Sequence, residues 1–240
     1  IEVEGEGSNG ARVALGGDAE SSRHNGNRDF ILDYRLAGDG IASGLTLFPG
    51  APGEENFFLA MVEPPRAIAT TQINPRDYVF VVDISGSMHG YPLDTAKTLL
   101  RHLIGGLRPS DTFNVLLFSG SNRMLNETSV PATQANVAQA LRTIAQMGGS
   151  GSTEIVPALK RVAALPKSPD VSRSVIVVTD GYVTVESEVF QLIRRNLGQT
   201  NVFAFGIGSS VNRHLIEGIA RAGQGEPFIV TRPEQAAAQA

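Results

Sequence analysis

The sequence of 240 residues has no cysteine, no net positive charge and no long apolar run. Without cysteine, the chain has no disulfide framework, no thiolate nucleophile and no thiolate metal ligand. A formal net charge of -4 argues against a binder of nucleic acid or acidic membranes, which depends on neutralising phosphate groups. No apolar stretch approaches the about 18 residues of a membrane span. The first residue is Ile1 rather than Met, so a signal peptide or anchor outside these residues stays compatible with the sequence.

Two nucleotide-binding motifs are incomplete. The glycine-rich stretch 148–153 has no Gly-Lys-Ser/Thr sequence, which a P-loop requires to hold phosphate groups. Gly206 and Gly208 form a pair without the third glycine of the dinucleotide fingerprint. Neither stretch therefore predicts a nucleotide site.

Residues 1–76 contain short runs of strand-like sequence and no stretch with the period of a helix. The candidate strands are 30–36, 45–48 and 57–62, and the last two are separated by a turn rich in proline and glycine. A β-structure this small is marginally stable alone. We therefore expect it to pack against the rest of the chain or against protein outside this sequence.

Strands and helices alternate from Tyr78 onward. Apolar runs predict strands, and apolar stripes with helical spacing predict helices in the segments between them. This alternation specifies a mostly parallel, doubly wound sheet with helices on both faces. We predict a β-rich flanking segment at 1–76 and an α/β domain with a six-stranded sheet at 77–240. The predicted strands are 79–82, 112–119, 123–130, 175–178, 202–207 and 228–230, and the predicted helices are 93–107, 137–145, 155–162, 185–197 and 212–222, with a helix-prone tail.

Two of these strands lead into a carboxylate. Asp83 follows the first apolar run, and Asp180 follows the fourth. In the common doubly wound strand order, 3-2-1-4-5-6, the first and fourth strands are neighbours where the winding reverses. Ligands bind at the carboxyl ends of the strands near this point, so we expect the two side chains to meet there.

Three hydroxyl groups are expected beside these carboxylates. Ser85 and Ser87 follow Asp83 at alternate positions in a glycine-containing loop, and the loop 148–153 carries Thr153 towards the same place. The set contains only oxygen ligands, which select a hard cation. Mg²⁺ or Mn²⁺ suits hydroxyls in a compact loop, with near-octahedral geometry at ~2.1 Å, better than Ca²⁺, which takes more carboxylates.

The charge of such a site is incompletely compensated. With two carboxylates at most, and some of them acting through water, the charge of a divalent ion is incompletely compensated and one coordination position stays free. An Asp or Glu side chain of another protein would fill that position. The residues therefore predict metal-bridged adhesion to a protein ligand, with no nucleic-acid partner.

The motif Asp83-x-Ser85-x-Ser87, together with Thr153 and Asp180, resembles the metal-ion-dependent adhesion site (MIDAS) of von Willebrand factor A domains. The resemblance extends over residues 77 to about 232 and includes Asp111-x-Phe113-Asn114, Thr179-Asp180-Gly181 and Phe205-Gly206-Ile207-Gly208. It implies a non-enzymatic, metal-dependent binding module, often extracellular or on the cell surface, whose metal site changes affinity when the last helix shifts. Where the family commonly has Gly-Gly-Thr, this chain has Gly-Ser-Thr after three extra residues, 148–150, so Ser152 rivals Thr153 as the ligand.

A narrower resemblance covers the segment before this domain. Asp29-Phe30 and the β-rich run up to Pro64-Pro65 are similar to the region that precedes the von Willebrand factor A domain in the inter-alpha-trypsin inhibitor heavy chain family, including its bacterial members. The resemblance to these proteins implies an extracellular or cell-surface location.

Each candidate residue also has a simpler interpretation. Asp83 and Asp180 would serve as turn caps, and Ser85 as a turn residue bonded to its own backbone. Either Thr153 or Ser152 would be the N-cap of the following helix. His89 lies near the site, but a solvated loop histidine is the simpler interpretation.

Two other functions remain as alternatives, a metal-dependent hydrolase and a regulatory subunit of an ATP-driven complex. A bound divalent metal can polarise a phosphoryl group or activate water. However, the sequence offers no convincing general base and no nucleophile with its activating partner. We therefore expect a protein that is not an enzyme.

Overall fold

The computed structural model describes residues 2–4, 12–14, 42–51, 53–64, 73–181, 183, 185–196 and 200–240. The chain divides into two compact units, residues 1–70 and 71–240. The strand expected at 30–36 lies outside the described residues, and the domain boundary between residues 76 and 77 stays a prediction.

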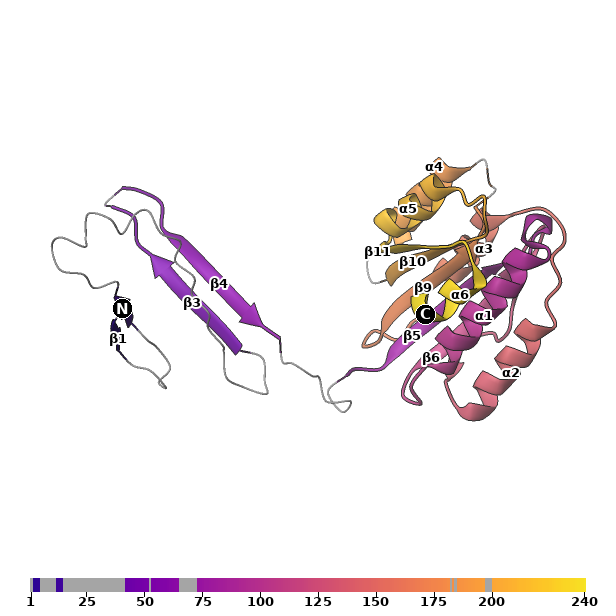
Figure 1. Ribbon diagram of the computed structural model, residues 1–240, viewed down its shortest axis with the longest axis horizontal. Helices are drawn as coiled ribbons and strands as arrows, with labels where there is room; N and C mark the ends of the chain where they lie inside the picture. Colours follow the sequence, from indigo (N-terminus) through magenta and orange to yellow (C-terminus); the bar gives the residue numbers. More distant parts are fainter. Residues whose placement is uncertain are drawn as a thin grey trace. The chain divides into compact units, whose positions relative to one another are not determined.

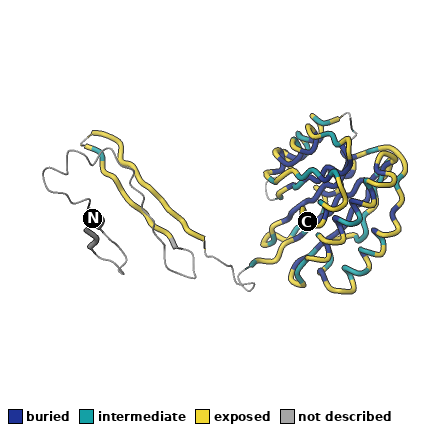
Figure 2. Tube along the Cα trace, in the orientation of Figure 1, coloured by how far each residue is buried: buried dark blue, intermediate teal, exposed yellow. Residues whose placement is uncertain are grey.

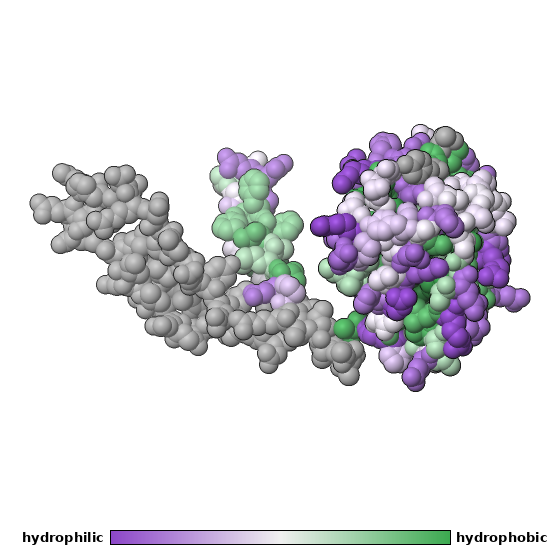
Figure 3. Space-filling view, turned by 45° about the vertical axis from the view of Figure 1, so that its right-hand side comes forward, coloured by the Kyte–Doolittle hydropathy of each residue, from purple (hydrophilic) through white to green (hydrophobic). Residues whose placement is uncertain are grey.

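In the first unit, the described residues form two antiparallel strand pairs, and Figure 1 shows the longer of them, β3 with β4. Strand β1 (Glu2–Glu4) pairs with β2 (Arg12–Ala14), and β3 (Ala42–Phe48) forms a hairpin with β4 (Phe57–Glu63). The hairpin confirms the two strands predicted at 45–48 and 57–62. Both strands are exposed (Figure 2), and their large apolar side chains form a hydrophobic surface in Figure 3.

The second unit is built on one sheet with the strand order β11-β10-β9-β5-β6-β7. Numbered along the predicted domain, this is the doubly wound order 3-2-1-4-5-6, so the expected order is confirmed. All pairs in this path are parallel except β6 with the edge strand β7, and the short β8 also pairs antiparallel with β6. The bounds are β5 (Arg76–Asp83), β6 (Thr112–Phe118), β7 (Asn122–Met124), β8 (Val130–Pro131), β9 (Ser172–Thr179), β10 (Thr200–Ile207) and β11 (Gln224–Val230).

The edge of this sheet differs from the sequence expectation. A single polar strand was expected at 123–130, but the structure has the two short strands β7 and β8. Between them, Asn126 bonds to the buried side chain of Asn114, which donates to its carbonyl at 2.9 Å and accepts from its amide at 3.3 Å. These side-chain bonds interrupt the strand.

Among the described residues of this unit, three helices pack on each face of the sheet, and Figure 1 shows their arrangement. One face carries α1 (Tyr91–Gly105), α2 (Gln134–Ala145) and α6 (Pro233–Gln239), and the other carries α3 (Ile155–Ala163), α4 (Glu186–Asn196) and α5 (Arg213–Ala222). The five predicted helices and the helix-prone tail are therefore confirmed. Over the described part of the chain, no helix combines the length and apolar character needed to cross a bilayer.

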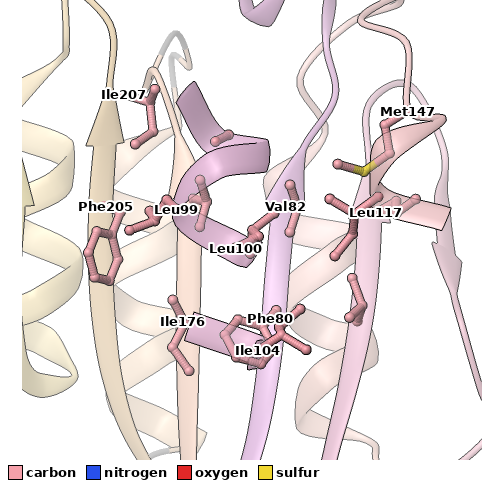
Figure 4. Close-up of a cluster of buried hydrophobic side chains, with 14 of the residues drawn as sticks. Phe80, Val82, Leu99, Leu100, Ile104, Leu117, Met147, Ile176, Phe205 and Ile207 are labelled. Atoms are coloured by element: carbon pink, nitrogen blue, oxygen red, sulfur yellow. The ribbon is translucent and has the colours of Figure 1, made fainter. Parts of the chain in front are cut away.

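The core consists of one apolar cluster on each side of the sheet. Phe80 and Val82 face α1, and Figure 4 shows them packed among Leu99, Leu100 and Ile104. The intervening residues of β5 point into the other cluster, beneath α3, α4 and α5. Both sets of side chains are buried, because helices cover both faces. This double burial explains why β5 is an unbroken apolar run in the sequence.

Two ion pairs lie at the amino end of the sheet, where the parallel strands begin. Arg173 Nε donates to Asp77 Oδ2 at 2.7 Å and joins β9 to β5. Thr112 Oγ1 donates to the other oxygen of Asp77 at 3.0 Å and ties β6 to the same carboxylate. Arg108 pairs with Asp111 at 2.7 Å just before β6. These contacts hold the central strands in register at the end opposite Asp83.

Candidate metal centre

Asp83 and Asp180 are located at the ends of two neighbouring strands. Strands β5 and β9 pair in parallel, with Val82 opposite Val178. Asp83 is the last residue of β5, and Asp180 directly follows β9. Both acids are buried, with exposed fractions of 0% and 4%. The fold therefore brings the two carboxylate-bearing residues to the same edge of the sheet, as expected.

The Asp83 carboxylate is held by hydrogen bonds to both oxygens. Oδ1 accepts from the Ser85 backbone N–H at 2.8 Å, and Oδ2 accepts from Thr179 Oγ1 at 2.6 Å. The first bond closes a tight turn, so the turn-cap interpretation of Asp83 is correct. This role does not exclude a second role as a metal ligand. Thr179 Oγ1 in turn accepts from the Gly181 backbone N–H at 3.0 Å. The Thr179 hydroxyl thus links Asp83 to the corner that carries Asp180.

The environment of Asp83 disfavours its negative charge. Burial is the main cause that raises the pKa of this carboxyl above its ordinary value, and repulsion from Asp180 adds to it. Hydrogen bonds from Thr179 and Ser85 act in the opposite direction but do not cancel the increase. A cation near the two carboxylates would offset both the desolvation and the repulsion.

Ser85 and Ser87 lie on one short turn after β5. Their hydroxyl oxygens are 3.2 Å apart, with Ser85 buried and Ser87 exposed at the surface. The turn is a 3-10 helix, Gly86–Met88, and the buried Met88 side chain anchors it in the core beneath α1. The Ser85 hydroxyl therefore contacts other side chains of the candidate site. His89 follows the turn and is exposed.

The loop 148–153 packs against this turn. Its backbone makes two hydrogen bonds to it, from Ser150 N to Ile84 O at 2.8 Å and from Gly86 N to Gly151 O at 2.9 Å. At Gly149 the approach is so close that an added Cβ would lie 3.0 Å from the His89 backbone. The loop is thereby held beside Ser85 and Ser87, and the half-buried Thr153 follows directly.

The structure contradicts the interpretation of Thr153 or Ser152 as a helix cap. The N-cap of α3 is Glu154, and no side chain makes a capping hydrogen bond there. The backbone N–H of Glu154 instead donates to Ser119 O at 3.0 Å. The Ser152 hydroxyl is turned towards Gly120, where an added Cβ would lie 3.1 Å from it. Neither hydroxyl is therefore used by the helix.

The predicted site residues are linked to different degrees. Hydrogen bonds join Asp83, Ser85 and Ser87, electrostatic repulsion links Asp83 to Asp180, and backbone bonds hold the loop that leads to Thr153. Within the described ranges, no group of three or more His, Asp or Glu side chains could hold a metal ion. A metal at this edge would therefore depend on hydroxyl ligands.

Asn212 is a positioning residue that the sequence analysis missed. Its backbone N–H donates to Asp180 O at 3.1 Å, and its side chain accepts from Leu215 N at 3.1 Å as the N-cap of α5. Gly181, with φ of 84°, packs so closely that a Cβ would lie 2.9 Å from Asn212 Cβ. An asparagine before a helical stripe predicts a cap. Its contact with Asp180 depends on tertiary structure that the sequence pattern does not reveal.

Comparison with known sequences gives a consistent result. The family model of the von Willebrand factor type A domain matches residues 76–227. A von Willebrand factor A domain-containing protein from Dictyostelium discoideum is 30% identical over 151 residues, which cover 62% of this chain and 17% of the relative. Inter-alpha-trypsin inhibitor heavy chain H3 from Bos taurus is 31% identical over 159 residues, 61% of this chain and 18% of the relative. The chain thus spans less than a fifth of the length of these two relatives.

Solved structures share the fold at lower identity. A von Willebrand factor type A protein from Catenulispora acidiphila has a TM-score of 0.66 at 20% identity, covering 84% of this chain and 48% of its own. Manganese-loaded TRAP protein from Plasmodium vivax has a TM-score of 0.56 at 22% identity, covering 69% and 71%. Proximal thread matrix protein 1 from the mussel byssus, solved with a zinc-occupied MIDAS motif, has a TM-score of 0.52 at 20% identity, covering 68% and 43%. With the family model matching well over half of its length, the chain belongs to the von Willebrand factor type A domain family.

Proposed function

We propose that the second unit is a metal-dependent protein-binding module. A Mg²⁺ or Mn²⁺ ion is held by Asp83, Ser85, Ser87, Thr153 and Asp180, and it accepts a carboxylate from a partner protein. The observation that carries this proposal is the buried, hydrogen-bonded Asp83 carboxylate, next to Asp180 and on the same tight turn as two serine hydroxyls.

The residues present fit a divalent cation. Two neighbouring acids whose charges repel each other at a buried strand end favour a divalent cation between them. All the proposed ligands are oxygens, which favours Mg²⁺ or Mn²⁺. Manganese in TRAP and zinc in proximal thread matrix protein 1 support a divalent metal in this fold.

Thr153 is favoured over Ser152 as the fifth ligand. Ser152 is turned towards Gly120, whereas Thr153 is half-buried and follows a loop bonded to the Ser85 turn. The loop exceeds the family pattern by three residues, 148–150. These residues make two of the contacts that hold the loop in place, the Ser150 hydrogen bond and the close approach of Gly149. The insertion is therefore compatible with Thr153 reaching the metal.

The proposed activity is binding rather than catalysis. When bound, the metal supplies positive charge that attracts a carboxylate. Ser87 lies at the surface, so a partner can approach this side of the site. The site presents hydroxyls and carboxylates but no nucleophile with an activating base. An extracellular or cell-surface location is part of this proposal and rests on the family resemblance.

A capture experiment tests the partner class. The immobilised chain is incubated with secreted proteins in buffer containing Mg²⁺, and bound proteins are eluted with chelator. We expect specific proteins to be retained, and their retention to be lost with Asp83→Ala or after amidation of their carboxylates. Retention that survives both chelation and amidation contradicts the proposal.

A further inference from the structure

A cavity of about 390 Å³ lies within the second unit at the amino end of the sheet. Residues of α3 and α4 and of the strands β9 and β10 line it. Val175 precedes Asp180 by five residues along β9, which places the cavity roughly 16 Å from the candidate metal centre. It is therefore a separate site, and its volume is within the range of small-molecule pockets, about 300–1,000 Å³.

The walls of the cavity are aliphatic. They include Leu159 and Val162 of α3, Leu192 and Ile193 of α4, and Val175 and Val202 of the sheet. The described lining residues include no aromatic and no acidic side chain. Such walls suit a saturated hydrocarbon chain.

Arg173 lines one edge of the cavity, but all its hydrogen-bonding groups are engaged within the protein. Its side chain is only 5% exposed, and its Nε donates to Asp77 Oδ2 at 2.7 Å. Its other nitrogens donate to the carbonyls of Leu165 and Pro166, at 3.1 and 2.5 Å. Arg173 therefore carries a compensated charge and serves as part of the wall.

The remaining polar groups of the lining differ in how far they are engaged. Lys167 has an interaction of its own, and the side-chain amide of Asn196 donates to the Leu192 carbonyl at 2.8 Å. The Thr200 hydroxyl makes no hydrogen bond among the described residues, so it can donate to a ligand or accept from one. The described lining thus offers a hydroxyl but no unpaired charge.

Water is a poor occupant of the apolar part of this cavity. An ordered buried water molecule makes about two to four hydrogen bonds, and the aliphatic walls provide none. An apolar group that displaces such poorly held water gains affinity. The cavity therefore favours a ligand that is itself largely apolar.

We propose that this cavity binds a neutral aliphatic molecule of the class of medium-chain alcohols. The hydrocarbon chain lies between α3 and α4 against the branched aliphatic walls, and the hydroxyl lies at Thr200. An uncharged head fits because Arg173 and Lys167 are engaged elsewhere, so a charged head would lose its hydration without gaining a counter-charge. The proposal is independent of the metal-binding function.

Calorimetric titration of the full chain with hexanol and octanol tests this assignment. All titrations contain chelator, so that a bound metal ion cannot contribute. Each buried methylene group is expected to strengthen binding by about fourfold, so octanol should bind about fifteenfold more tightly than hexanol. Octanoate and octylamine, with a chain of the same length and a charged head at pH 7, should both bind severalfold more weakly than octanol.

Matched variants locate the site. Ala163 lines the cavity from an exposed position at the end of α3, whereas the neighbouring Ala164 is exposed and does not line it. Ala163→Phe should reduce octanol affinity at least tenfold, and Ala164→Phe should leave it unchanged. Thr200→Val should reduce octanol affinity severalfold, whereas Thr200→Ser keeps the hydroxyl and should bind octanol like the unmodified chain. Circular dichroism establishes that each variant is folded.

Three results would overturn the proposal. The first is no binding of octanol at millimolar concentration by the folded chain. The second is unchanged octanol binding in both Ala163→Phe and Thr200→Val. The third is binding of octanoate or octylamine at least as tight as that of octanol. Because the proposed metal ligands play no part here, Asp83→Ala should bind octanol like the unmodified chain, which separates this test from that of the metal site.

Discussion

The Thr179 hydroxyl donates a 2.6 Å hydrogen bond to Asp83 Oδ2 and thereby joins the ends of the two central strands, β9 and β5. The same hydroxyl accepts from the Gly181 backbone N–H. A single buried side chain therefore positions one acid directly and orients the corner that bears the other. We therefore expect the candidate metal centre to depend on this contact as well as on its proposed ligands.

Replacing Thr179 with valine tests this positioning role. Thr179→Val keeps the shape of the side chain but leaves Asp83 Oδ2 and the Gly181 N–H without their partner. We expect a loss of about 1–3 kcal/mol in the free energy of unfolding, measured by urea denaturation. Metal affinity should fall about 10- to 100-fold, as for other residues that orient metal ligands. Thr179→Ser keeps the hydroxyl and should bind metal like the unmodified chain, so equal affinity in the valine variant would contradict the role.

The loop 148–153 offers a matched pair of glycines. At Gly149 an added Cβ would lie 3.0 Å from the His89 backbone, whereas at Gly148 it would meet nothing within 4 Å. We expect Gly149→Ala to push the loop away from the Ser85 turn and to weaken Mn²⁺ binding severalfold in a calorimetric titration. Gly148→Ala should bind Mn²⁺ normally. Equal affinities in the two variants would show that the contact with the turn is not needed for metal binding.

The choice between Thr153 and Ser152 is testable in the same way. Thr153→Val removes the proposed ligand hydroxyl and should lower Mn²⁺ affinity at least tenfold. Ser152→Ala removes the hydroxyl that faces Gly120 and should have little effect. The opposite order of affinities would assign the metal to Ser152.

Asp111 gives a prediction for pH dependence. Burial alone would raise the pKa of Asp111, but hydrogen bonds from the Arg108 side chain and from the Arg76 and Arg108 backbone lower it below its ordinary value. The folded state therefore holds a proton on this acid less readily than the unfolded state. The resulting stability is present above the unfolded pKa of about 3.9 and is lost as pH falls through the folded pKa.

The variant Asp111→Asn tests this linkage. It should be less stable than the unmodified chain at pH 7, by about 1–2 kcal/mol, because an amide cannot accept the same charge-assisted bonds. The difference should shrink as pH falls below about 4. Urea denaturation between pH 3 and 7 measures it, and a difference that stays constant over this range would exclude the proposed contribution.

Much of the fold is predictable from the sequence because the central strands are buried on both faces. Val79–Val82 and Val175–Val178 are unbroken apolar runs, and each is followed by its acid within two residues. The doubly wound order then makes the two acids neighbours. Local pattern and one topological rule were therefore sufficient to bring Asp83 and Asp180 together.

The remaining features depend on contacts between distant residues. Thr179 is a strand residue by sequence, and its bond to Asp83 arises from the pairing of β5 with β9. Asn114 divides the predicted edge strand only because its side chain meets Asn126 across the sheet edge. The apolar character of both strands of the β3–β4 hairpin is readable from the sequence, but their exposure in this unit is not. Such contacts have no signal in local periodicity.

The most direct test of the metal site is calorimetric titration of the chelator-treated chain with Mg²⁺ and Mn²⁺, comparing Asp83→Ala with Asp170→Ala. Asp170 is an exposed acid in the turn before β9, at the opposite end of the sheet, and serves as the control. We expect one metal ion bound per chain, unchanged binding in Asp170→Ala and no binding in Asp83→Ala. Binding of equal affinity in both variants, or no binding by the unmodified chain, would contradict this expectation.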